Sequence, residues 1–149
     1  MNIRNRVELY KQVFGDKCKA IEPVKEFIKC IPADDLEQLE ALRRLNTVLS
    51  DEYKVIIPVM TVWVRDYNYV NATYEMYLTE PSLEEFLHLF RHHLQNIDRR
   101  YERRGLLVED IEEQSIREMP YKDTVKRMYG EDDARAWAKY VIEMAQGIK

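Results

Sequence analysis

SLEEFLHLFRHHLQNIDRRYERRG, residues 82–105, is the most regular stretch of the chain and predicts a single long helix. Ser82 and Glu85 form a capping box, in which each side chain accepts a hydrogen bond from the other residue's backbone amide. Apolar residues then recur every three or four positions along one side, and Gly105 suits the end of the helix because glycine tolerates the left-handed cap conformation. The apolar stripe consists of Leu83, Phe86, Leu87, Phe90, Leu94, Ile97 and Tyr101. We therefore expect an uninterrupted amphipathic helix from Ser82 to Arg104.

The same signals predict further helices on both sides of this segment. We expect a short helix after Pro23 and another that is capped by Asp34 or Asp35 and ends near Ser50 or continues toward Ile57. Apolar spacing of three and four indicates further helices over residues 3–14, 58–77, 108–118, 121–129 and 132–146. All four glycines follow stretches with helical spacing, which predicts that each ends a helix; they are Gly15, Gly105, Gly130 and Gly147.

Residues 50–64 leave two interpretations open. The β-branched run of Val55, Ile56 and Ile57 favours an extended segment near residues 53–57, and residues 53–64 as a whole could form a strand. We prefer a helix that begins at Pro58, because apolar and aromatic residues continue at spacings of four and three as far as Tyr77.

The chain as a whole is typical of one soluble helical domain. Its 149 residues are enough to bury a core without disulfides, and it contains no Asn-Gly or Asp-Gly hairpin signal and no glycine-rich phosphate loop. We therefore predict an all-α fold over residues 1–149, a compact bundle of six to eight short or medium helices.

Composition also bears on location. The net charge is −4, there is no secretory leader pattern, and the longest apolar run is too short to cross a bilayer. Two cysteines without metal or redox spacing suggest reduced thiols. We expect a cytoplasmic protein without a membrane segment.

One side of the 82–104 helix carries a weak metal-binding pattern. Glu84, His88 and His92 are spaced at i, i+4 and i+8, so their side chains point in similar directions, away from the apolar stripe. Imidazole and carboxylate groups bind zinc, copper, iron or nickel, but a third or fourth ligand would have to come from another helix or a second subunit. The competing interpretation is an exposed polar face. His93 lies at the edge of the stripe and is expected to be partly buried with one hydrogen-bonded nitrogen.

The same helix predicts a cationic face toward its C-terminal end. Its arginines are Arg91, Arg99, Arg100, Arg103 and Arg104. Arginine binds phosphate or carboxylate through two parallel hydrogen bonds, so this face could contact nucleic acid or an acidic protein. Attraction to the helix dipole, or pairing with the acidic residues 109–113, would explain the arginines equally well. Among the ten tyrosines, Tyr69 lies off the apolar spacing and is the best candidate for an exposed contact.

These observations favour a non-enzymatic function. The chain shows no nucleophile motif or catalytic acid pair and no cofactor signature. We therefore expect an interaction or regulatory protein that binds a protein partner through the arginine face and Tyr69, with homodimer formation as an option. The first alternative is RNA or DNA binding through residues 91–104. The second is a metal-binding protein or hydrolase that uses Glu84, His88 and His92.

Overall fold

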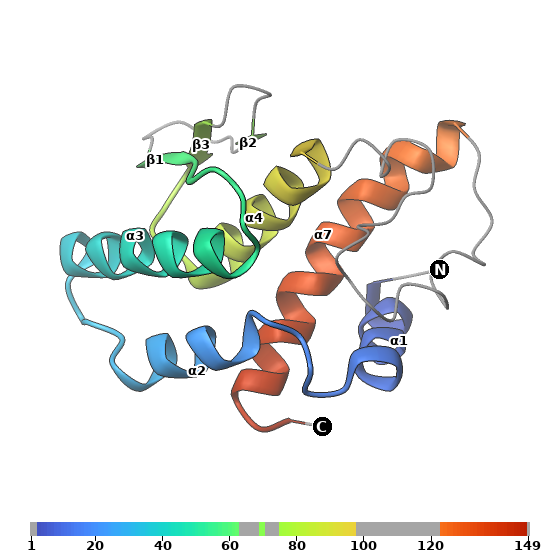
Figure 1. Ribbon diagram of the computed structural model, residues 1–149, viewed down its shortest axis with the longest axis horizontal. Helices are drawn as coiled ribbons and strands as arrows, with labels where there is room; N and C mark the ends of the chain where they lie inside the picture. The colour runs from blue at the N-terminus through green and yellow to red at the C-terminus, as the bar shows by residue number, and fades with distance from the viewer. Residues whose placement is uncertain (1–2, 63–68, 71–74, 98–122, 149) are drawn as a thin grey trace.

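The computed structural model describes residues 3–62, 69–70, 75–97 and 123–148, which form five helices and a small three-stranded sheet (Figure 1). The fold is therefore mostly helical, and over these residues it is not the all-helical bundle of six to eight helices that the sequence predicts. The helices are α1 (Ile3–Phe14), α2 (Ile21–Lys29), α3 (Asp35–Glu52), α4 (Leu83–Ile97) and α7 (Asp123–Ala145). The strands are β1 (Val59–Val62), β2 (Tyr69–Val70) and β3 (Glu75–Leu78). The helix expected over residues 108–118 lies outside the described residues.

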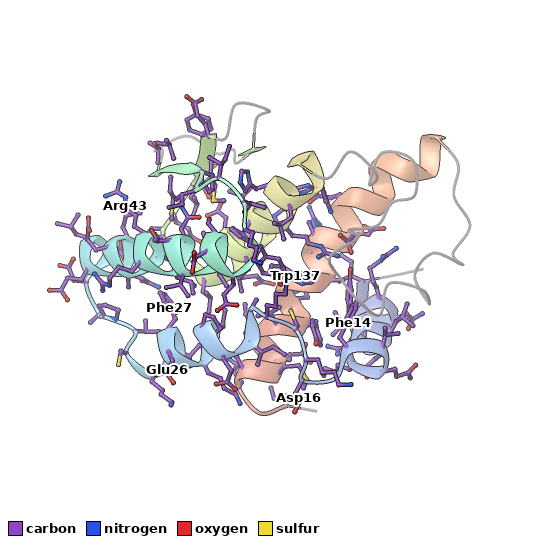
Figure 2. The ribbon with its side chains drawn as sticks, viewed as in Figure 1. Phe14, Asp16, Glu26, Phe27, Arg43 and Trp137 are labelled. Carbon is purple, nitrogen blue, oxygen red and sulfur yellow. The ribbon has the colours of Figure 1, made fainter. Side chains whose placement is uncertain are left out.

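The longest of these helices, α7, packs against α1, α2 and α4 and so lies at the centre of the arrangement (Figure 1). Its inward residue Trp137 is 1% exposed and meets Tyr53 at the end of α3 and Phe90 of α4, with ring centroids 6.5 Å away in both cases (Figure 2). Three residues further along α7, Tyr140 stacks on Tyr10 of α1. Burial of these large apolar side chains, at about 25 cal/mol per Å², is the main stabilising term of the fold.

Helix α7 runs without interruption through Gly130, so the two separate helices expected over residues 121–129 and 132–146 are wrong. A glycine inside a helix costs only about 1 kcal/mol relative to alanine, and the packing of the following turns outweighs that cost. Gly15 and Gly147 do have the positive φ angles, 57° and 84°, that were expected at helix ends. Gly105 lies outside the described residues.

The first three helices follow their sequence signals closely. Helix α1 has the expected bounds, and α2 begins two residues before Pro23, which is tolerated in the first turn of a helix. Asp34 caps α3, its side chain accepting hydrogen bonds from the amides of Leu36 and Glu37 at 2.8 and 3.1 Å. Helix α3 ends at Glu52, which confirms the shorter of the two predicted ends. Ile31, two residues after the end of α2, is 49% exposed.

The helix expected over residues 58–77 is wrong, because the described parts of this segment form a sheet. The strand order is β1-β3-β2, with β1 parallel to β3 and β2 antiparallel to it. Met76 and Leu78 are buried while Glu75 and Tyr77 are partly exposed, which is the two-residue alternation of a strand. The β-branched content of β1 also favours a strand, as the alternative interpretation of residues 53–64 proposed.

Helix α4 confirms the predicted helix from its capped start as far as Ile97. The Ser82 hydroxyl accepts a hydrogen bond from the Glu85 amide at 3.3 Å, whereas the Glu85 carboxylate binds Thr79 and the Glu80 amide. Residues 98–104, the remainder of the predicted helix, lie outside the described residues. None of the described helices is long and apolar enough to cross a membrane.

Candidate metal site

The first half of α4 and the middle of α7 border an open groove with a volume of about 680 Å³. Charged side chains dominate its lining, which includes four carboxylates and two cationic groups. The main lining residues are Glu80, Glu84, Glu85, His88, His92, Glu131, Arg135 and Lys139. A groove with this excess of carboxylates over cationic side chains favours a positively charged ligand.

His88, His92 and Glu131 meet at one side of this groove. One turn of α4 separates the two histidines, so their side chains lie on the same face of the helix, with ring centroids 4.8 Å apart. Glu131 approaches them from α7: its Oε1 lies 2.9 Å from His88 Nε2, and its Oε2 lies 2.9 Å from His92 Nε2. The three potential ligand atoms all lie within 4.8 Å of one another, and all three side chains are partly buried.

The separation of the two nitrogens matches what one metal ion requires. Two imidazole nitrogens bound to a tetrahedral zinc ion at about 2.0–2.1 Å lie roughly 3.3 Å apart, and here the His88 and His92 Nε2 atoms are 3.2 Å apart. The Glu131 oxygens are slightly closer to the nitrogens than ligands of one ion would be. Because bare lone pairs at such distances repel each other, these contacts need either protons on the histidine nitrogens or a cation between the three groups.

The electrostatics of the cluster suit a cation. The hydrogen bond with His92 lowers the pKa of Glu131 to about 2, against burial, with further lowering from Arg135 and His88. Glu131 is therefore ionised at neutral pH. Burial, followed by the charge of His92, lowers the pKa of His88, although Glu131 opposes this. A neutral imidazole and an ionised carboxylate are the protonation states that bind metal.

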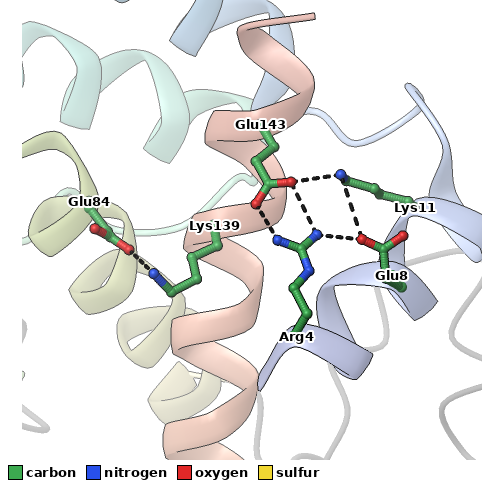
Figure 3. Close-up of polar contacts among 6 residues, drawn as sticks. All are labelled: Arg4, Glu8, Lys11, Glu84, Lys139 and Glu143. Carbon is green, nitrogen blue, oxygen red and sulfur yellow. Dashed lines mark hydrogen bonds and ion pairs between the residues drawn. The ribbon is translucent and has the colours of Figure 1, made fainter. Parts of the chain in front are cut away.

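Glu84, the third residue of the predicted metal pattern, does not join this cluster. Its carboxylate accepts a hydrogen bond from Lys139 of α7 at 2.9 Å (Figure 3). Glu131 takes its place, and it supplies the ligand from another helix that the sequence pattern required. No signal in the sequence pairs Glu131 with the histidines, because the contact depends on how α7 crosses α4.

Arg91 was expected on an exposed cationic face, but it is 1% exposed and lies between α4, α1 and α7. Its Nε donates a hydrogen bond to Oδ2 of Asp133 at 2.9 Å, and its terminal nitrogen donates to the Tyr10 hydroxyl at 3.2 Å. The guanidinium also lies 5.4 Å from the ring centroid of Trp137. Arg91 therefore belongs to the interior and cannot contact a partner at the surface.

Asp133 is the centre of this buried polar cluster. Besides Arg91 it accepts hydrogen bonds from the Gln95 amide and the Tyr10 hydroxyl, and Arg6 lies 3.9 Å away. Burial raises the pKa of Asp133 to about 7, and the charge of Arg6 opposes that rise. Asp133 lies inside α7, the helix that packs against α1, α2 and α4.

The other predicted site residues remain untested. Arg99, Arg100, Arg103 and Arg104 lie outside the described residues, so the arginine face without Arg91 stays a prediction. Tyr69 lies in β2, where its backbone is in register with Tyr77 of β3.

His93 makes the hydrogen bond that the sequence predicts, because its Nε2 donates to the Ile56 carbonyl at 2.8 Å. Its side chain is fully buried, whereas the sequence predicts partial burial. Burial lowers the pKa of His93 despite that bond.

Comparisons of the chain with protein-family models, with curated proteins and with solved structures each found no match.

Proposed function

We propose that this protein binds one divalent transition-metal ion, with zinc as the first choice, through His88, His92 and Glu131. The observation that carries the proposal is the convergence of two imidazole nitrogens and a carboxylate from two helices within 4.8 Å. Two nitrogen ligands favour zinc, copper, nickel or iron over magnesium and calcium, which prefer oxygen.

The surroundings support a site that keeps an open coordination position. Three protein ligands are fewer than the four of a closed structural zinc site, and the cluster borders a groove through which water or a small ligand can enter. Glu84 and Glu85, the acidic residues nearest the histidines on α4, are already held by Lys139 and by Thr79. The described residues therefore support metal binding without indicating a particular reaction.

Zinc competition against a chromophoric chelator, and visible absorption of the cobalt(II) form, test the proposal in protein purified without a histidine tag. We expect one ion per chain. Each of the variants H88A, H92A and E131Q removes one proposed ligand. Each should weaken zinc binding by more than the roughly 10–100-fold that loss of a supporting residue causes. The cobalt spectrum should indicate four-coordination in the wild type.

The matched control is E84Q, which removes the acidic residue of the sequence pattern. Because Glu84 pairs with Lys139, this variant should bind zinc as the wild type does. The absence of stoichiometric binding would refute the proposal. If E84Q lost binding and E131Q kept it, the ligand set would be the one that the sequence pattern suggests and not the one proposed here.

A further inference from the structure

A continuous chain of hydrogen bonds connects the candidate metal site to the buried ion pair. His92 Nδ1 lies 2.8 Å from Oε1 of Gln95, one turn further along α4. The Gln95 amide nitrogen lies 2.8 Å from Oδ2 of Asp133 on α7. The same oxygen accepts a hydrogen bond from Arg91 Nε at 2.9 Å. Gln95 is 4% exposed, so water does not compete freely for either end of its amide.

The direction of every hydrogen bond in this chain follows from Arg91. Its Nε is always a donor, so Oδ2 of Asp133 must accept and carries no proton. A proton on Asp133, if present, would sit on Oδ1, which faces the Tyr10 hydroxyl. Gln95 therefore has to turn its NH₂ group toward Oδ2, which leaves its carbonyl oxygen facing His92. Because that oxygen only accepts, Nδ1 of His92 must be the donor.

We infer that Gln95 is a positioning residue, which holds a proton on Nδ1 of His92 and so leaves Nε2, beside Glu131 and His88, as the nitrogen that gives up its proton to a metal ion. The inference rests on the proposed function in one respect, that the exposed Nε2 lone pair serves a metal ion. Metal-bound histidines commonly donate their second ring nitrogen to a supporting acceptor, which sets the tautomer and the orientation of the ring. Here the supporting acceptor is itself held by a buried ion pair.

The first measurement needs no metal. Nitrogen-15 NMR of the imidazoles, at a pH high enough for them to be neutral, reports which ring nitrogen carries the proton. In the wild type the two ring nitrogens of His92 compete for this proton, because Gln95 accepts from Nδ1 and Glu131 accepts from Nε2, so we expect a measurable share of it on Nδ1. In Q95M, which has a side chain of similar size but no amide, the proton should move to Nε2, beside the Glu131 carboxylate. A purely structural role for Gln95 would not move this proton.

The second measurement is zinc affinity. Q95M should bind zinc roughly 10–100-fold more weakly than the wild type, as is usual for the loss of a supporting residue. Q146M, which makes the same substitution at an exposed position after the end of α7, should match the wild type. If Q95M does not fold, Q95N replaces it, because its shorter amide cannot reach both His92 and Asp133.

The two measurements separate the inference from the proposed function. Absence of zinc binding in the wild type, together with a proton that moves from Nδ1 in Q95M, would end the metal proposal and leave the positioning role supported. A wild-type protein that binds zinc, with Q95M unchanged in both affinity and tautomer, would overturn the positioning role. A wild-type His92 that carries no proton on Nδ1 would overturn it directly.

Discussion

Asp133 is the residue on which the buried charges depend. Arg91 and Arg6 are 1% and 3% exposed, and Asp133 is the acidic residue that faces both of them among the described side chains. A buried ion pair contributes little net stability compared with apolar packing, because both partners lose their hydration. Removal of one partner is different, since it leaves the other charge buried without compensation.

We therefore expect D133A to lower the free energy of unfolding by about 3–5 kcal/mol, measured by urea denaturation. The matched control is D132A, which removes the neighbouring carboxylate without touching Arg91 and should change stability by about 0.5 kcal/mol or less. A loss in D133A as small as that in D132A would mean that water or another group takes over the role of Asp133.

The sequence predicted part of the candidate site, and the reason for the remainder is physical. Helical spacing placed His88 and His92 together because both lie on one helix. The same reasoning treated the polar side of that helix as exposed. It could not show that α7 covers this side and brings Glu131 and Asp133 to meet polar partners. Arg91 was misplaced for that reason, since a buried arginine and an exposed one have the same spacing.

At the scale of single elements, Gly15 and Gly130 have two different backbone roles, one at the end of a helix and one inside a helix. Gly15 ends α1 with a φ of 57°, and a β-carbon added there would meet no atom within 4 Å. Only backbone strain therefore opposes a substitution at this position. Gly130 lies inside α7, where alanine is the better helix former.

G15A should destabilise the protein by roughly 1–2 kcal/mol, the usual cost of the left-handed conformation for a residue with a β-carbon. G130A should stabilise it by about 0.5–1 kcal/mol through helix propensity. Thermal and urea unfolding of both variants test these signs. Destabilisation in G130A similar to that in G15A would indicate that Gly130 ends a helix, as its sequence context suggests.

Elements were predicted best where two independent signals agree. Asp34 and Ser82 mark helix starts by capping chemistry, and apolar stripes follow both, so α3 and α4 were recognised. Residues 58–77 carry a weaker signal, because aromatic and β-branched residues at spacings of three and four also contain an alternation of two. In the structure the strand pairing places Met60 and Met76 in register on adjacent strands, and both are buried in the common core.

At the scale of the whole molecule, ion pairs join the first helix to the last. Glu143 of α7 lies 2.8 Å from Arg4 and 2.7 Å from Lys11, both on α1 (Figure 3). The hydrogen bond from Arg4, followed by that from Lys11, lowers the pKa of Glu143 to about 2, against burial. Its ordinary value is 4.5, so the unfolded chain binds more protons than the folded chain between these two pH values.

The stabilisation from Glu143 is therefore complete above pH 4.5 and is lost as the pH falls toward 2. E143Q should show a shallower decrease of the free energy of unfolding between about pH 5 and 3 than the wild type. Its effect at pH 7 should stay within about 1 kcal/mol, because the pair lies near solvent. E22Q, which removes an exposed pair within α2, is the control. Identical slopes in E143Q and the wild type would contradict the expectation.

The central position of α7 has a consequence for the order in which the protein can fold. This helix follows every other described element in the chain, yet α1, α2 and α4 all bury apolar side chains against it. While residues 123–145 are still being synthesised, the earlier helices have no completed core, and their apolar faces remain open to aggregation or to chaperones. The proposed ligand Glu131 lies in the same helix, so a metal ion could bind at this site only after residues 123–145 have been synthesised.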